Sequence, residues 1–123
     1  MNNTKEVTSG ATDSKELVLK CVTAINNLDF SAARKCLHDE FKFEGVLGSR
    51  NGGDVYIDDM KKMQLKYNVK KTFADGTDVC LLYDLTMSGL IIFGCGWYKV
   101  EDGKIKSLKV VFDPRPVLEA SKK

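Results

Sequence analysis

The stretch from residue 68 to residue 112 constrains the fold most, because it has the pattern of four consecutive β-strands joined by tight turns. The expected strands span residues 68–74, 78–87, 90–100 and 104–112, of which the last three are richest in β-branched and aromatic residues. The turns lie at Asp75-Gly76, Ser88-Gly89 and Asp102-Gly103, pairs that supply the positive φ angles a hairpin needs. Such a meander has an apolar face, so the first half of the chain is expected to cover it.

Two helices are expected at the start of the first half. The first begins at Asp13, with Glu16 three places later in the capping-box position, and its apolar residues keep helical spacing as far as Leu28. Asp29 then caps a second, shorter helix that ends near His38. A connection this short requires two antiparallel or sharply angled neighbours.

A strand and a third helix are expected between these helices and the meander. The strand covers residues 41–47, and the glycine-rich residues 48–53 interrupt it. Asp54 caps the third helix. Its apolar stripe is Tyr56, Met60, Met63 and Tyr67.

The order of elements predicts an α+β fold with three N-terminal helices packed on one face of a mostly antiparallel sheet. We expect a disordered lead-in over residues 1–12, one domain over 13–116, and a flexible tail over 117–123 that is either a frayed turn of helix or disordered. The tail follows Pro114 and Pro116, since proline cannot donate a hydrogen bond to a sheet ladder.

Composition narrows the class of protein. A chain of 123 residues fits one domain, and its net charge of +2 predicts no strong attraction to nucleic acid or membrane. No stretch reaches the ~20 apolar residues of a membrane span, and the polar start predicts no signal peptide, so a cytoplasmic location is the expectation. One histidine and four cysteines without C-x-x-C spacing predict no metal and no cofactor. We expect all four thiols to act as small buried hydrophobes: Cys21, Cys36, Cys80 and Cys95.

The hairpin at Ser88-Gly89 fixes which residues of two strands share a face. On one face it pairs Leu85 with Ile92, Tyr83 with Gly94, and Leu81 with Gly96. On the other it pairs Asp84 with Phe93, Leu82 with Cys95, and Cys80 with Trp97. The two glycines either hollow the first face for a ligand, with Tyr83 and Tyr98 as polar groups, or bend the sheet while Tyr83 covers Gly94. The second face is also apolar, which favours sheet-to-sheet dimerisation.

The element order, the run from Val79 to Leu85, the run from Trp97 to Ile105 and the ending Phe112-Asp113-Pro114-Arg115-Pro116 resemble the nuclear-transport-factor-2-like superfamily. The SnoaL-like polyketide cyclase branch is the most similar part of it. The resemblance spans residues 13–116 and implies a cystatin-like cone, in which a strongly curved sheet wraps the helices. It also implies a pocket at the wide end and homodimers through the sheet. It does not imply one function, since this scaffold hosts many.

The resemblance also allows a test for steroid isomerase chemistry, which needs an aspartate base with a tyrosine and a protonated aspartic acid. Those three groups fall on Gly45, Cys21 and Gly96, so isomerisation by that mechanism is rejected. The same alignment predicts a pocket lined by Cys21, Ile25, Phe43, Met60, Met63, Leu81, Tyr83, Tyr98, Leu108, Val110 and Phe112. The predicted dimer face consists of Leu82, Asp84, Phe93, Cys95 and Trp97.

Three hypotheses about function follow. The first is an enzyme of the cyclase, isomerase or lyase type acting on a small hydrophobic carbonyl compound, with Asp113, Tyr98 and Tyr83 as catalytic candidates. The second is a non-catalytic module that binds a hydrophobic small molecule. The third is a structural dimerisation module whose interior is filled by its own side chains. An ionisable group at the cavity favours the first, an apolar cavity the second, and the lack of a ligand-sized cavity the third.

Overall fold

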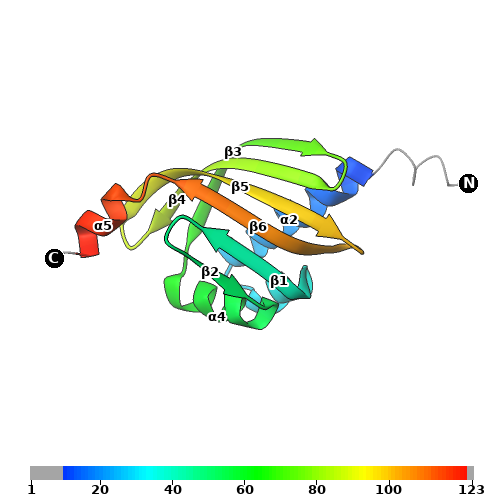
Figure 1. Cartoon of the computed structure of the whole chain (residues 1–123), viewed down its shortest axis with the longest axis horizontal. Helices are drawn as coiled ribbons and strands as arrows, with labels where there is room; N and C mark the ends of the chain where they lie inside the picture. Colours follow the sequence, from blue (N-terminus) through cyan, green and yellow to red (C-terminus); the bar gives the residue numbers. More distant parts are fainter. Residues whose placement is uncertain (1–9, 122–123) are drawn as a thin grey trace, which may run out of the picture.

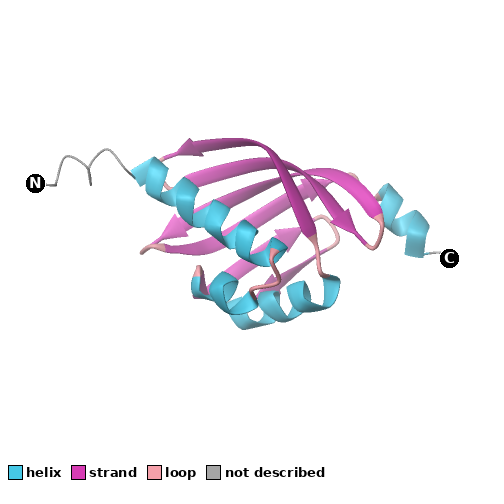
Figure 2. Cartoon of the chain, turned by 180° about the vertical axis from the view of Figure 1, so that it is seen from behind, coloured by secondary structure: helices cyan, strands magenta, loops and turns pink. Residues whose placement is uncertain are grey.

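The computed structural model describes residues 10–121 and shows a six-stranded sheet with helices on one face (Figure 1). The helices are α2 (Gly10–Asn26), α3 (Phe30–Lys35), α4 (Gly53–Met63) and α5 (Arg115–Ser121). The strands are β1 (Leu37–Gly45), β2 (Gly48–Asn51), β3 (Lys66–Asp75), β4 (Asp78–Met87), β5 (Leu90–Glu101) and β6 (Lys104–Phe112). Seen from behind, α2 and α4 cover the inner face of the twisted sheet, while α5 lies at its far end (Figure 2). The α+β prediction is confirmed.

The sheet has the strand order β2-β1-β6-β5-β4-β3. Its neighbours are antiparallel except β1 and β6, which run parallel. The chain passes from β1 through β2, α4 and the strands β3 to β5 before it reaches β6. β6 then lies beside β1 and runs in the same direction. The first strand and the meander therefore form one continuous sheet.

The register predicted for the central hairpin is confirmed. Met87 pairs with Leu90 across a two-residue turn in which Ser88 and Gly89 have φ of 51° and 85°. All six expected cross-strand pairs occur, including Tyr83 with Gly94 and Leu81 with Gly96. Two successive positive φ angles match the right-handed twist of the strands, so the turn sets the register.

The first turn of the meander differs from the prediction by one residue. Asp75 pairs with Asp78, so the loop consists of Gly76 and Thr77 rather than Asp75-Gly76. The register of β3 against β4 also shifts between Val69 and Lys71, which is a bulge. β3 begins at Lys66, two residues before the predicted start.

The predicted start of the first helix is too late, and the predicted end of the second is wrong. α2 begins at Gly10, three residues before Asp13. Asp29 does cap α3, because its carboxylate accepts the N–H of Ala32 at 3.2 Å. α3 ends at Lys35, however, and His38 lies in β1. The N–H of Ile105 in β6 donates to the carbonyl of Cys36 at 2.8 Å, so sheet pairing ends the helix where local sequence would continue it.

The region around residues 48–67 holds three further corrections. Residues 48–51, predicted as a break, form the exposed strand β2 beside β1. The N-cap of α4 is Gly52 at φ 105°, and Asp54 pairs instead with the guanidinium of Arg34 at 2.6 Å. α4 ends at Met63, and its C-cap Gln64 has the left-handed conformation, so Tyr67 belongs to β3 rather than to the helical stripe.

Asn26 joins α2 to the sheet. Its side-chain amide donates to the carbonyl of Tyr67 at 2.9 Å, and its side-chain oxygen accepts the N–H of Tyr67 at 2.7 Å. The two bonds reproduce the pairing that a neighbouring strand would make, so the end of α2 is fixed against the start of β3.

The two ends of the chain were predicted as tails. Residues 115–121 form the helix α5, in agreement with the helical alternative for the tail from residue 117. Of the predicted lead-in, residues 1–9 lie outside the described residues, and residues 10–12 belong to α2. Within residues 10–121, no helix is long and apolar enough to cross a membrane.

Candidate functional site

The interior between the helices and the sheet is where the sequence predicted a pocket. Ten of the eleven predicted lining residues belong to one buried cluster or pack against it. Phe43 and Phe112 are its partly buried members, whereas Met63 is 42% exposed and lies outside it. The structure therefore brings these residues together, apart from Met63, as a packed core.

The two glycines of β5 face this interior and are covered by Tyr83. A Cβ atom added at Gly94 would lie 3.4 Å from a ring carbon of Tyr83. One added at Gly96 would lie 3.2 Å from the Tyr83 hydroxyl and 3.1 Å from the ring of Tyr98. The space left by the missing side chains is occupied, which favours the interpretation of Tyr83 as a covering residue.

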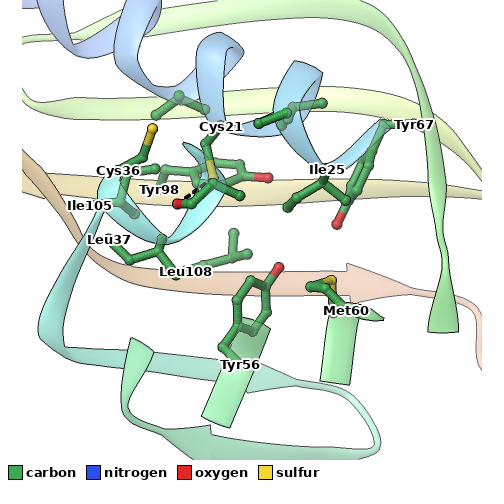
Figure 3. Close-up of a cluster of buried hydrophobic side chains, with 14 of the residues drawn as sticks. Cys21, Ile25, Cys36, Leu37, Tyr56, Met60, Tyr67, Tyr98, Ile105 and Leu108 are labelled. Atoms are coloured by element: carbon green, nitrogen blue, oxygen red, sulfur yellow. Dashed lines mark hydrogen bonds between the residues drawn. The ribbon is translucent and has the colours of Figure 1, made fainter. Parts of the chain in front are cut away.

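All four tyrosines of the chain lie in the interior. The rings of Tyr67 and Tyr83 meet edge to face, with centroids 4.9 Å apart. Tyr56 extends into the core from α4 and Tyr67 from β3, and their hydroxyls point toward each other (Figure 3). Tyr98 lies beside Cys21 in the same view. The interior is thus lined mostly by apolar side chains, with the phenol hydroxyls of the tyrosines among them.

Burial keeps these phenols protonated. It is the largest cause of the raised pKa at each of the four tyrosines, and it raises the pKa of Tyr67 to about 12. A hydrogen bond between the Tyr56 and Tyr67 side chains acts in opposite directions on the two, raising the pKa of Tyr56 and lowering that of Tyr67. Near neutral pH these groups are hydrogen-bond donors and acceptors, not bases.

Surface hollows on the described part of the chain lie elsewhere. Five have volumes between about 280 and 730 Å³, and Leu108 is the only predicted lining residue that borders any of them. The largest lies between the start of α2 and the β5–β6 turn, where Lys20 and Lys99 face Glu16 and Glu101. Its mixed charges do not favour one class of ligand.

The ionisable catalytic candidate lies away from the interior. Asp113 is exposed at the end of β6, where the guanidinium of Arg115 lies 2.6 Å from its carboxylate. Hydrogen bonds from Arg115 lower the pKa of Asp113 to about 2. A carboxylate with so low a pKa is a poor proton carrier at neutral pH. His38, the single imidazole, is half-buried in β1, and its Nδ1 accepts the N–H of Glu40 at 3.0 Å.

The outer face of the sheet has a different surface. Large apolar side chains are exposed there at Phe73 (58%), Phe93 (59%), Trp97 (46%) and Val111 (55%). Cross-strand pairing connects them, because Phe73 pairs with Cys80, Cys80 with Trp97, and Cys95 with both Leu82 and Val111. We call this the outer patch: Phe73, Cys80, Leu82, Phe93, Cys95, Trp97 and Val111.

Ion pairs surround the outer patch. Lys70 pairs with Asp84 at 3.6 Å, Lys99 with Asp78 at 3.3 Å, and Lys109 with Glu44 at 3.7 Å. Trp97 is tied to this rim, since its indole N–H donates to Asp78 at 2.9 Å and the Lys109 amine lies 5.8 Å from its ring centroid. The predicted dimer residues therefore lie together on one face, Asp84 at its edge.

Two features of the interior were not named in the sequence-based site. Tyr56 and Tyr67 complete the hydroxyl cluster, and Tyr67 was missed because it was assigned to a helix instead of β3. The thiols of Cys21 and Cys36 lie close together in the interior and interact, although 15 positions separate them and no motif connects them. Within the described residues, no group of three His, Cys, Asp or Glu side chains is placed to hold a metal ion.

The curved sheet with helices on its inner face defines the class of protein. It matches a solved protein of unknown function with a cystatin-like fold from Methylobium petroleophilum PM1. The TM-score is 0.76 over 83% of this chain and 76% of that one. Their sequence identity is 9%, so this likeness shows the fold alone.

The chain belongs to the SnoaL-like domain family, whose model matches residues 18–108. An NTF2-like protein of unknown function from Cytophaga hutchinsonii ATCC 33406 is 47% identical, with a TM-score of 0.84 over 85% of this chain and 94% of that one. An LEH-like epoxide hydrolase from M. tuberculosis is 25% identical, with a TM-score of 0.74 over 89% of each chain. No curated protein matches the chain.

Proposed function

We propose that this SnoaL-like domain works as a non-catalytic homodimer whose two copies pair through the outer patch. The observation that carries the proposal is the exposure of Phe93, Trp97, Phe73 and Val111 on adjoining strands of one face. Single exposed apolar residues are ordinary, but a contiguous group with a polar rim is typical of protein–protein interfaces.

The charges around the outer patch favour a second copy as the partner. Its rim holds lysines and carboxylates in alternation, so neither sign dominates. In a two-fold dimer the same patch meets itself, and a rim with both signs can exchange its ion pairs with the copy opposite. Dimer contacts commonly bury about 800 Å² from each partner, an area that several large side chains and their rim supply.

Two features of the interior support a non-catalytic role. Among the residues described, no carboxylate or imidazole is buried in the interior, and its tyrosines stay protonated at neutral pH. The acid available at the end of β6, Asp113, is paired with Arg115. A cyclase, isomerase or lyase mechanism would need a proton carrier beside its substrate.

The test is the oligomeric state of two charge variants. We expect sedimentation and light scattering to show a dimer for the unmodified chain. We expect Phe93→Lys to weaken the dimer at least ~30-fold, since loss of a central anchor costs about 2 kcal/mol or more. Val55→Lys is the matched control, because Val55 is a 36% exposed apolar residue of α4, on the helix side of the sheet and away from the outer patch.

The single tryptophan provides a second readout. In a dimer, Trp97 is protected from an aqueous quencher, and the protection disappears on dilution. A monomeric unmodified chain at about 100 μM, or equal weakening by both variants, would refute the proposal, since an interface of ordinary strength forms well below that concentration.

A second candidate function is the binding of a small hydrophobic molecule in the interior, in contact with Tyr83 and Tyr98. The hydroxyl cluster favours it, because polar groups within an apolar wall are what such sites use to orient a ligand. Because the interior is packed, binding requires its side chains to rearrange. A thermal-shift screen with aromatic, steroid-like, polyketide-like and fatty compounds tests it. A bound ligand at ~100 times its Kd adds about 2.7 kcal/mol, and Tyr98→Phe is expected to reduce that shift.

A further inference from the structure

Cys21 and Cys36 form a contact that the proposed function does not use. Cys21 lies in α2, Cys36 is the C-cap of α3, and the short connection between the helices brings their thiols close enough to interact (Figure 3). Both sulfurs also face carbonyls of α3: the Cys21 Sγ lies 3.9 Å from the Ala33 oxygen, and the Cys36 Sγ lies 3.5 Å from the Ala32 oxygen. The two thiols therefore share one small volume.

The backbone of Cys36 is fixed on both sides. Its N–H donates to the Ala33 carbonyl at 3.1 Å, and its carbonyl accepts the N–H of Ile105 at 2.8 Å. α3 and β6 therefore hold the backbone of Cys36 in place beside Cys21 of α2. A fixed pair of thiols reacts with one oxidant more readily than two mobile thiols that must first meet.

Cys36 also borders a surface hollow, and Cys21 is not among the residues that line it. The hollow has a volume of about 490 Å³, and its wall includes Cys36, Lys20, Lys35 and Asp29. The residues themselves are buried, with Cys36 3% and Cys21 2% exposed. This arrangement admits a small reagent to Cys36 first.

The charges facing Cys36 come from three directions. Lys20 projects from α2, Lys104 lies at the start of β6, and Lys35 and Asp29 belong to α3 and its cap. The amine of Lys104 is held near this site by the carbonyl of Lys35, at 2.8 Å. The positive charges favour a thiolate, while the carboxylate of Asp29 and the carbonyl end of α3 oppose it.

The balance favours the thiolate at Cys36. The hydrogen bond from Cys21 is the largest cause and, with Lys20 and Lys104, lowers the pKa of Cys36 to about 7 against the effect of burial. The same contact and burial raise the pKa of Cys21. One thiol of the pair is thus suited to attack, and the other retains its proton.

We propose that Cys21 and Cys36 form a dithiol site that a hydroperoxide converts into a disulfide, with Cys36 as the attacking and Cys21 as the resolving cysteine. The Cys36 thiolate attacks one peroxide oxygen, the O–O bond breaks, and the products are Cys36 sulfenic acid and hydroxide, or alkoxide from an alkyl hydroperoxide. The Cys21 sulfur then attacks the Cys36 sulfur. An S–S bond forms, the S–O bond breaks, and the leaving oxygen takes the Cys21 proton and departs as water.

The other two cysteines provide an internal comparison. Cys80 and Cys95 are in contact on the outer face and are more exposed than the first pair. They are diagonal neighbours, because Cys80 is paired with Trp97 and Cys95 with Leu82, and diagonal residues are farther apart than directly opposed ones. The pKa of Cys80 is raised, chiefly by burial. Exposure alone therefore predicts faster oxidation of Cys80 and Cys95, whereas geometry and charge predict faster oxidation of Cys21 and Cys36.

The experiment maps disulfides after native treatment with hydrogen peroxide at pH 7, followed by alkylation and tryptic digestion. Trypsin separates the first pair into peptides 21–34 and 36–42 and leaves the second pair within one peptide, 72–99. We expect 21–34 to be recovered joined to 36–42, with Cys80 and Cys95 still alkylated. The disulfide is also expected to raise the Tm by several degrees, since it cross-links a short loop.

Variants test the order of the two steps. In Cys21→Ser, a 1,3-dione that traps sulfenic acids is expected to label Cys36, whereas Cys36→Ser leaves Cys21 unlabelled. Lys20→Gln is expected to slow alkylation of Cys36 at pH 7 roughly fivefold, as a one-unit rise in pKa would. Lys62→Gln, in α4, is the matched control and is expected to leave the rate unchanged. Circular dichroism checks that each variant is folded.

Three results would each overturn the proposal. The first is separate recovery of peptides 21–34 and 36–42 after peroxide treatment. The second is oxidation of Cys80 and Cys95 ahead of the first pair. The third is labelling of Cys21 in Cys36→Ser at the rate seen for Cys36 in Cys21→Ser.

Discussion

Tyr83 of β4 and Trp97 of β5 lie on opposite faces of one sheet, and their surroundings differ completely. Tyr83 is 1% exposed and covers two glycines, whereas Trp97 is 46% exposed among ion pairs. The inner face has helices against it, and its aromatic residues fill the space between the layers. The outer face has no such cover among the residues described, although its aromatic residues are as large.

The difference indicates what each set of aromatic residues contributes. Inner aromatic residues are expected to stabilise the folded monomer, because unfolding returns their whole surface to water. Outer aromatic residues keep much of their contact with water in the monomer, so they contribute mainly when a partner covers them. The following predictions test that division.

The largest expected effect is a loss of stability at alkaline pH. All four tyrosines have a raised pKa in the folded state and the ordinary value near 10 when unfolded. The unfolded chain releases these protons first, so the stability present below pH ~10 is lost as the pH rises above it. At pH 11 each tyrosine is expected to remove about 1.4 kcal/mol, and the four together ~5 kcal/mol.

Tyrosinate absorbance measured alongside far-ultraviolet circular dichroism checks this. Ionisation is expected to coincide with unfolding rather than to precede it. Tyr67→Phe is the control, and it is expected to reduce the loss of stability at pH 11 by about 1.4 kcal/mol, the contribution of one tyrosine. Ionisation of several tyrosines near pH 10 in a folded chain would show that the interior is open to water.

The next effect compares Tyr83→Ala with Trp97→Ala. The first is expected to lower the free energy of unfolding by ~3–5 kcal/mol, because it empties the space over Gly94 and Gly96. The second is expected to cost less than about 1 kcal/mol. Urea denaturation in the Phe93→Lys background measures both without a contribution from association. Similar losses for the two variants would remove the distinction between the faces.

The smallest effect compares two neighbours on β5. Gly96→Ala places a Cβ within 3.1 to 3.2 Å of Tyr98, Leu108 and Tyr83, and is expected to cost ~1–3 kcal/mol by overpacking. Cys95→Ala, which faces the outer side, is expected to cost less than about 1 kcal/mol. Thermal unfolding measures the pair. If Gly96→Ala left the Tm unchanged, there would be free space beside Gly96 in the interior.

The meander was largely predictable because its signals are local. The Ser88-Gly89 and Asp102-Gly103 pairs determine tight turns, and a turn of known length determines which residues face each other. The family was also predictable, from the runs around Tyr83 and Trp97 and from the element order.

Long-range pairing accounts for most of the errors. His38 lies in β1 instead of the expected helix, because β1 pairs with β6, about seventy residues later in the chain. Asp54 forms an ion pair with Arg34 instead of capping α4. The contact between Cys21 and Cys36 likewise depends on the angle between two helices, which no spacing in the sequence specifies.

The candidate site was predictable only as a set of inward-facing positions. Alternation along the strands assigned Leu81, Tyr83 and Tyr98 to the inner face. Whether inward-facing residues line a cavity or fill it depends on how far the helices stand from the sheet. Side-chain volumes across several layers determine that distance, and periodicity carries no information about it.

The bulge in β3 has a consequence for solubility. β3 is an edge strand, so its free N–H and C=O groups offer a template for another strand and for fibrillar growth. The register shift between Val69 and Lys71 distorts that template, and the exposed lysines at 66, 70 and 71 repel an identical edge. Growth of the sheet beyond β3 is therefore disfavoured, so at this edge the protein is protected against open-ended aggregation while its outer face stays available for a closed assembly.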